Sequence, residues 1–416
     1  MSTITQEVNA VTAVSNQPIL ATTSQKNLVA AGIAVELVLL VYLLATQNLS
    51  QSLLLIIGFA LGLTLFHARF GFTSAFQRMA AVGNGQALRA HMLMLAVAVT
   101  LFAPILSYGI SFFGGSVAGH VSPISTSLIV GAFLFGVGMQ IGGGCASGTL
   151  YTVGSGRTVM FITLIFFIVG STVGAYHLPF WLEEMPSLGA YSLATSTGFG
   201  YGGAWLISIV LFGLIAWVTL VIEKKKKAPK VEPIPSAKGW KRILRGSWPL
   251  FVAAIILAVL NALTLMTRGA PWGVTSGFAL WGSKLALLSG FDVTSWGYWQ
   301  GNRAATLQQS IFADSTSVLN FGIIIGAFVA SAAAGLFKIT KITSRRTWGS
   351  IIGGFLMGYG ARLAFGCNIG AYFGGIASFS LHGYVWGLLA MVGTFVALYL
   401  RPYFGLSVPK PTDSFC

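Results

Sequence analysis

The sequence predicts an all-α membrane protein with about ten transmembrane helices, arranged as two inverted repeats with Gly-rich re-entrant half-helices. The first observation is composition: 8% of the 416 residues are charged, whereas soluble domains carry about 25%. The second is charge distribution, since no Asp, Glu, Lys or Arg occurs between Arg89 and Arg157. These two observations exclude a soluble fold. The third is a Gly-Cys motif that occurs twice and indicates a duplication.

Ten segments satisfy the criterion of about 20 predominantly apolar residues for a membrane span. They lie near residues 28–46, 52–68, 88–108, 128–142, 157–176, 200–222, 248–266, 317–337, 348–363 and 382–400. Four Gly-rich segments are too short or too interrupted to span, and we expect them to be re-entrant: 70–84, 143–156, 272–290 and 366–380.

A basic, Pro-containing segment at 223–247 separates two sets of spans. We therefore expect five parts, which are a polar N-terminal tail (1–27), a first repeat half (28–222), this linker (223–247), a second repeat half (248–402) and a C-terminal tail (403–416).

The basic residues predict the orientation in the membrane. The net charge of +15 would suggest a nucleic-acid partner in a soluble chain. In a membrane protein it reflects basic residues collected on the cytoplasmic side. If the linker is cytoplasmic, alternation of the spans places 20 of the 24 Lys and Arg residues on that side, all except Arg268, Lys284, Arg303 and Arg362. We therefore expect both termini in the cytoplasm, the lipid bilayer as surroundings, and no nucleic acid.

The internal repeat has two parts. Residues 131–148 and 353–370 align without gaps and share Gly131, Phe133, Leu134, Gly136, Gly138, Gly144, Cys145 and Gly148. Upstream, residues 71–76 and 273–278 share the pattern G-x-T-S-x-F. In the expected topology the span before Cys145 runs toward the cytoplasm and the span before Cys367 runs away from it. The halves are then inverted, which is a recurring plan of transporters.

The Gly-Cys motif points to an anion. The glycines before Cys145 let the backbone leave a helix, so a following half-helix could begin at this cysteine with unpaired amide groups. A helix start of this kind favours an anion, and a thiol adds a soft, polarisable surface. Gly144, Cys145, Gly366 and Cys367 are therefore candidates to bind a sulfur oxyanion. The alternative is that each cysteine is inert packing, but the matched positions favour function. Cys416 has no expected role.

Other candidates each carry an alternative. Arg362 lies five residues before Cys367, where it could attract an anion or extend to the membrane interface. Four hydroxyl residues of the upstream motif could donate to an oxyanion or bond neighbouring helices: Thr73, Ser74, Thr275 and Ser276. Glu36 is a weak candidate for proton coupling. The histidines show no ligand spacing, and we expect them at interfaces.

These motifs resemble the YeeE/YedE family of sulfur-compound transport proteins over about residues 50–402. The most specific stretches are Gly142–Gly148, Pro271–Phe278 and Gly366–Gly370, and 69–78 resembles the family's first motif. The resemblance implies uptake of thiosulfate across the bacterial inner membrane, with the anion passed between cysteine thiols along a narrow central path. Cys145 and Cys367 match two of three functional cysteines, and the third position is occupied here by Gly71. Asn368 belongs to the same motif as Cys367 and joins the substrate-binding candidates.

Three function classes remain open. The first is a transporter of thiosulfate or a related sulfur anion, with a cytoplasmic sulfur-accepting protein as a further expected partner. The second is a transporter of a selenium compound or another small anion. The third is a thiol-dependent membrane oxidoreductase or sulfurtransferase. An enzyme would be expected to show haem-ligating histidines, a C-x-x-C pair or a metal cluster. We therefore expect no enzyme activity, no cofactor and no metal.

Overall fold

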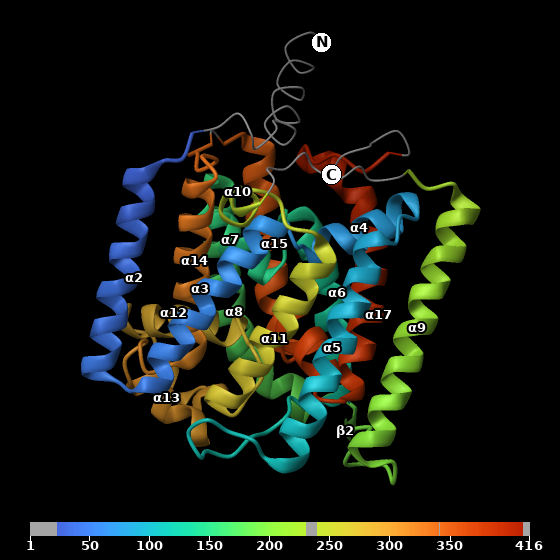
Figure 1. Ribbon diagram of the computed structural model, residues 1–416. Helices are drawn as coiled ribbons and strands as arrows, with labels where there is room; N and C mark the ends of the chain where they lie inside the picture. The colour runs from blue at the N-terminus through green and yellow to red at the C-terminus, as the bar shows by residue number, and fades with distance from the viewer. Residues whose placement is uncertain (1–22, 230–238, 341, 411–416) are drawn as a thin grey trace.

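The computed structural model describes residues 23–229, 239–340 and 342–410 (Figure 1). In the first half these form α2 (Lys26–Thr46), α3 (Leu49–Ala68), α4 (Phe72–Val82), α5 (Gln86–Tyr108), β1 (Pro123–Ser125), α6 (Thr126–Ile141), α7 (Ala146–Gly154), α8 (Thr158–Glu183), β2 (Ser187–Ala190) and α9 (Gly200–Lys226). The next elements are α10 (Trp240–Arg245), α11 (Leu250–Arg268), α12 (Thr275–Leu288), η2 (Val293–Ser295), η3 (Gly297–Trp299), η4 (Gly301–Arg303) and α13 (Ala304–Gln308). The last are α14 (Ser315–Ala333), α15 (Ser344–Leu363), η5 (Asn368–Gly374), α16 (Gly375–Ala377), α17 (Leu381–Leu400) and η6 (Arg401–Phe404).

The expected all-α membrane architecture is confirmed. In the described part of the chain, nine helical segments are long and apolar enough to cross a membrane, and α15 with η5 and α16 supplies a tenth. Each of the ten expected spans coincides with one helix within these segments, with ends that differ by up to seven residues. The two short strands pair antiparallel, with Pro123 opposite Ala190. Cys416 lies outside the described residues, as do parts of both tails and of the linker.

Two of the four segments expected to be re-entrant differ from that expectation. α4 continues α3 and α7 continues α6, so that Leu49–Val82 and Thr126–Gly154 each form one interrupted span. α15 and η5–α16 meet at a bend of 41°. The physical reason is that a few residues of non-helical backbone interrupt a helix without reversing its direction. α12, with 14 residues, is about 21 Å long and too short to cross the bilayer.

Glycines bring the helices into backbone contact. On α3 and α14, a Cβ atom at Gly62 would lie 2.2 Å from the Ile323 carbonyl oxygen, and one at Gly326 would lie 2.1 Å from the Phe59 carbonyl oxygen. Small residues at a four-residue spacing allow such close approach between membrane helices, where van der Waals packing drives association. The high glycine content therefore serves interhelical packing as well as helix breaks.

The two central spans touch in a reciprocal way. Gly131 of α6 contacts Gly360 of α15, and Gly138 of α6 contacts Gly353 of α15. In the repeat alignment Gly131 corresponds to Gly353 and Gly138 to Gly360, so the first contact becomes the second when the halves are exchanged. The same order shows that α6 and α15 run antiparallel.

The outer contacts of these two spans also correspond. A Cβ atom at Gly358 would lie 2.2 Å from the Phe167 carbonyl oxygen of α8, and one at Gly136 would lie 2.3 Å from the Ala390 carbonyl oxygen of α17. Because Gly136 and Gly358 are aligned repeat positions, α8 and α17 take equivalent places. The inverted relation of the halves, like the domain boundaries, stays a prediction, and these contacts favour it.

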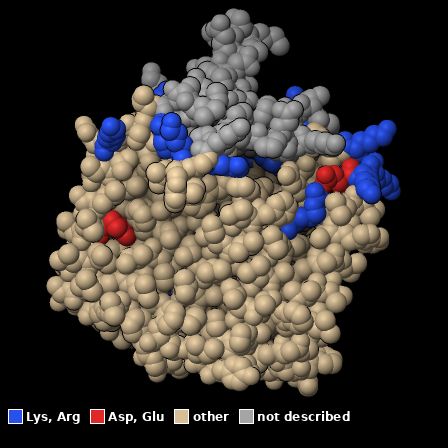
Figure 2. Space-filling model, viewed as in Figure 1, with Lys and Arg blue, Asp and Glu red and all other residues tan. Residues whose placement is uncertain are grey.

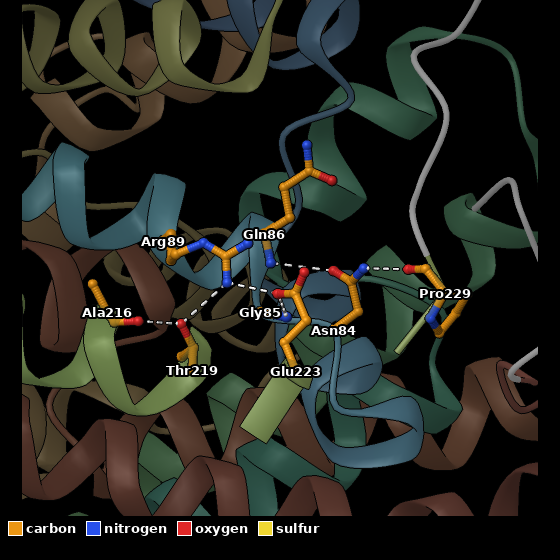
Figure 3. A network of polar contacts seen from close by, with 8 residues as sticks. All are labelled: Asn84, Gly85, Gln86, Arg89, Ala216, Thr219, Glu223 and Pro229. Atoms are coloured by element: carbon orange, nitrogen blue, oxygen red, sulfur yellow. Dashed lines mark hydrogen bonds and ion pairs between the residues drawn. The ribbon is translucent and has the colours of Figure 1, made fainter. Parts of the chain in front are cut away.

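Basic side chains gather at one end of the bundle. Figure 2 shows Lys and Arg concentrated at the end near α10, and none on the lower part of the same face. At this end Arg89 of α5 forms an ion pair of 2.7 Å with Glu223 of α9. Asn84 donates to the Pro229 carbonyl oxygen at 2.8 Å, and both contacts belong to one network that holds the end of α9 against the start of α5 (Figure 3).

We predict that Gly326→Ala destabilises the folded protein by roughly 1–3 kcal/mol, since the added methyl group overpacks a backbone contact. The measurement is the thermal unfolding midpoint in detergent. Gly213→Ala is the matched control, because Gly213 also lies inside a helix and a Cβ atom there meets nothing within 4 Å. An equal midpoint for the two variants contradicts the packing argument.

Candidate functional site

Two cysteines begin the second parts of the two central spans. Cys145 is the N-cap residue of α7 and Cys367 is the N-cap residue of η5. Their backbone conformations are close, with φ and ψ of −82° and −174° at Cys145 and −101° and −166° at Cys367. Both side chains are buried, and Cys145 lies within electrostatic interaction range of Cys367. The structure therefore brings the two Gly-Cys motifs together at the interrupted centre of the bundle.

Left-handed backbone opens each helix break. Gly143 has φ of +85°, and the aligned residue Phe365 has φ of +59°. Glycine adopts this conformation freely, whereas a bulky residue there costs about 1–3 kcal/mol. Gly366 follows with φ of +149°, and a Cβ atom on it would lie 2.7 Å from the Ala371 nitrogen. The glycine requirement at Gly366 is therefore steric as well as conformational.

The thiols contact the starts of the helices that they precede. The Ile369 backbone N–H donates to the Cys367 sulfur at 3.4 Å. The Cys145 sulfur lies 3.6 Å from the Ser147 hydroxyl oxygen. Each sulfur thus sits at a helix start, where backbone N–H groups face a common point and favour negative charge.

Arg362 is buried rather than extended to an interface, with 8% of its surface exposed. Its guanidinium donates to the Tyr298 hydroxyl and to the Thr275 hydroxyl, both at 2.7 Å. Among the described residues no Asp or Glu forms an ion pair with it. A buried cation without a counter-ion is costly, so this side chain favours an anion close by. Arg362 also lies within electrostatic range of Cys367.

Gln140 occupies the equivalent position in the first half. It is fully buried, and its amide donates to the Thr73 carbonyl oxygen at 3.0 Å. Thr73 and Thr275 are aligned positions of the upstream motif, so the Gln140–Thr73 and Arg362–Thr275 contacts correspond. The alignment with Arg362 was the available signal for Gln140, whereas nothing in the sequence marked Tyr298.

The motif hydroxyls divide between the two expected roles. Ser74 donates to the Gly71 carbonyl oxygen and Ser276 to the Thr316 hydroxyl, so both bond within the protein. Thr275 accepts from Arg362. The Thr73 hydroxyl is buried and has no hydrogen-bond partner, which leaves it available to a ligand.

Several buried polar atoms near the breaks lack partners. Asn368 is fully buried, and neither its amide nitrogen nor its amide oxygen forms a hydrogen bond. The Arg362 Nε and the Gln140 amide oxygen are also unpaired. Buried polar groups are nearly always satisfied in proteins, so this concentration indicates a place where a polar ligand or water completes the bonding.

Three side chains that are not among the candidates form a cluster that includes a neighbour of Cys145. Arg69, Arg157 and Tyr151 interact electrostatically with one another, and Tyr151 also lies in range of Cys145. Gly71 is nearby in sequence and is the N-cap residue of α4. It therefore holds the same structural place as Cys145 and Cys367, at the start of a helix after a break.

A separate cavity of about 270 Å³ lies at the end of the bundle opposite α10, where α11 ends and α14 begins. Its lining includes Arg268 and Gln51, but none of the candidate site residues. Arg268 donates to the Thr316 hydroxyl at 3.1 Å, and Ser276 donates to the same oxygen. A polar connection thus leads from this cavity to the second copy of the upstream motif.

Comparison with known proteins supplies the family. The family model described as sulphur transport matches residues 67–396. A thiosulfate transporter, TsuA, of Spirochaeta thermophila is 28% identical over 83% of this chain and 97% of its own length. TsuA of Escherichia coli is 26% identical over 84% of this chain and 94% of its own length. A probable transporter of E. coli, YedE, is 34% identical over 35% of this chain and 36% of its own length.

The family and these relatives are transporters rather than enzymes, which confirms the expectation that the chain is not an enzyme. The matched region contains both central spans and both cysteines at their breaks. This multi-pass membrane protein therefore belongs to the sulphur transport family, the YeeE/YedE family that its repeated Gly-Cys motifs resemble.

Proposed function

We propose that this protein takes up thiosulfate, or a closely related sulfur oxyanion, through a narrow path between its two helix breaks. The observation that carries the proposal is the placement of Cys145 and Cys367 as buried N-cap residues at matched positions of two antiparallel, interrupted spans. Two relatives that match most of this chain are named thiosulfate transporters. The proposed substrate is therefore consistent with both the site and the family.

In this proposal the path binds the anion mainly through uncharged groups, with Arg362 as the positively charged side chain. At each break, helix-start amide groups and one thiol meet the ligand, and Arg362 supplies the positive charge beside Cys367. Thiosulfate combines anionic oxygens with a soft terminal sulfur. The oxygens suit amides, hydroxyls and the guanidinium, and the soft sulfur suits a polarisable thiol. The substrate-binding residues we propose are Gly144, Cys145, Gly366, Cys367, Arg362, Thr73, Ser74, Thr275, Ser276 and Asn368.

We further propose an orientation in the inner membrane. The end that carries the basic side chains faces the cytoplasm (Figure 2), and both termini lie there. The halves are inverted repeats, so the two breaks are approached from opposite sides. A cytoplasmic sulfur-accepting protein at the basic end is part of the same proposal.

We predict that Cys145→Ala and Cys367→Ala each abolish growth of a bacterium that depends on this protein for thiosulfate as its sole sulfur source. Each substitution removes the polarisable contact at one break. The measurement is growth rate at matched membrane expression. Cys416→Ala is the control, since it removes a thiol to which no role is assigned. Normal growth of both cysteine variants rules out a role for the thiols. If the unmodified protein supports growth only on a selenium or sulfite source, the substrate is not thiosulfate.

We predict that Arg362→Gln raises the KM for thiosulfate uptake by roughly 10- to 100-fold, because a charged hydrogen bond contributes about 1.5–3 kcal/mol. This variant places at the second break the residue that Gln140 provides at the first. Arg303→Gln is the control, since Arg303 is an exposed arginine whose guanidinium lies 4.5 Å from the centroid of the Tyr298 ring. An unchanged KM for Arg362→Gln removes this arginine from the binding site.

We predict that Gly71→Cys is tolerated and changes the transport rate by more than Gly71→Ala does. The nearest atom to a Cβ atom at Gly71 would be the Ser74 hydroxyl oxygen, at 3.0 Å on a flexible side chain, and the nearest backbone atom would be the Arg69 carbonyl oxygen, at 4.0 Å. The variant adds a third thiol at a helix start of the kind that Cys145 and Cys367 occupy. Uptake of labelled thiosulfate into cells is the measurement, and equal rates for the two variants show that a thiol at this position has no effect.

A further inference from the structure

Two histidines that are far apart in the sequence meet beside the second helix break. His120 lies in the loop between α5 and β1, and His382 is the second residue of α17. Their ring centroids are 5.2 Å apart. The sequence indicated no such cluster, because 262 residues separate the pair and only the fold unites them.

The pair is tied to the backbone that forms the break. A ring nitrogen of His120, Nε2, lies 3.0 Å from the carbonyl oxygen of Phe365, the left-handed residue two positions before Cys367. The His120 backbone N–H donates to the Ser378 hydroxyl at 2.9 Å. A change of charge on His120 therefore acts directly on the loop that positions Cys367.

His382 has a nitrogen available for a proton. Its Nδ1 lies 2.6 Å from the Ser380 hydroxyl, whereas its Nε2 is buried and has no partner. The residue is fully buried, and the ring lies against Gly375, where a Cβ atom would be 2.6 Å from it. A buried nitrogen without a partner is rare in proteins, and an imidazole nitrogen is a group that can bind a proton near neutral pH.

The charges that face the pair are positive. Arg268 and Arg362 act electrostatically on His120, and the neighbouring polar groups are the hydroxyls of Ser122, Ser378 and Ser380. Burial lowers the pKa of His120, and the two arginine charges lower it further. The hydrogen bond to the Phe365 carbonyl oxygen opposes this shift in pKa, and the net effect favours the neutral form of His120. A dianion beside Arg362 offsets the positive charge and favours proton uptake, and by linkage a bound proton favours the anion.

A negative-inside membrane potential opposes the import of a dianion, and proton coupling would offset this electrical cost. Moving one negative charge into a compartment at −100 mV lowers its accumulation by about 50-fold, and thiosulfate carries two such charges. Each proton that enters with the anion cancels one of them.

We propose that His120 and His382 form a proton-binding site that couples proton entry to anion import, which makes the protein a proton–anion symporter. The proposal rests on the proposed function, since it needs an anion at Arg362. In the proposed orientation the pair lies toward the outer side, where it can take up a proton together with the anion.

The test uses the full chain reconstituted in liposomes, with labelled thiosulfate and the membrane potential clamped at zero by potassium and valinomycin. An inward gradient of one pH unit should drive about tenfold accumulation if one proton accompanies each anion, and about 100-fold for two. A pH-sensitive dye in the lumen should report acidification when thiosulfate is added outside. His382→Gln and His120→Gln should each reduce the accumulation ratio to about 1 while exchange at equal pH continues.

His177→Gln is the matched control, because His177 is exposed and its ring contacts the Tyr359 hydroxyl away from the pair. It should accumulate thiosulfate as the unmodified protein does. If the unmodified protein exchanges thiosulfate but its accumulation does not depend on the pH gradient, proton coupling is wrong. The proposed function is unaffected by that result. Full gradient-driven accumulation in both pair variants overturns the assignment of the site. No thiosulfate exchange by the unmodified protein overturns both proposals.

Discussion

The structure depends on interrupting two central helices inside the bilayer without exposing backbone polar groups to lipid. Such interruption is tolerated only where protein surrounds the break. Glycines meet this condition, because Gly131, Gly138, Gly353 and Gly360 bring α6 and α15 into backbone contact. α8 and α17 then close the other sides through Gly358 and Gly136. The close packing and the helix breaks are therefore two consequences of the same glycine-rich sequence.

Much of this arrangement could be predicted from the sequence. Hydrophobic length located all ten spans, because the requirement to cross the bilayer is local. The Gly-Cys motif located the breaks, because glycine marks where helical backbone ends. Glycine does not indicate the direction of the helix after a break, so the sequence predicts re-entrant segments at α4 and α7 although these helices extend α3 and α6.

The contacts of the site were less accessible to sequence reasoning. Tyr298 reaches Arg362 from a loop 64 residues away, and His120 reaches Phe365 across 245 residues. No periodicity or motif encodes such pairings, since they arise from tertiary packing, within the second half for Tyr298 and Arg362 and between the halves for His120 and Phe365. The buried position of Arg362 likewise depends on its hydrogen bonds to Tyr298 and Thr275. The sequence alone therefore does not decide whether Arg362 binds an anion or extends to the membrane interface.

The two halves have similar backbones, so aligned positions at which their side chains differ indicate how the two helix breaks differ in function. Equivalent places hold Gln140 and Arg362, Ala146 and Asn368, and Gly143 and Phe365. In each pair the second half carries the residue with more charge, more hydrogen-bonding capacity or more conformational strain. A path with identical ends would hold an anion equally at both. Under the proposed function, these substitutions make the outer break the stronger binding site, so capture occurs there and the weaker inner break favours release.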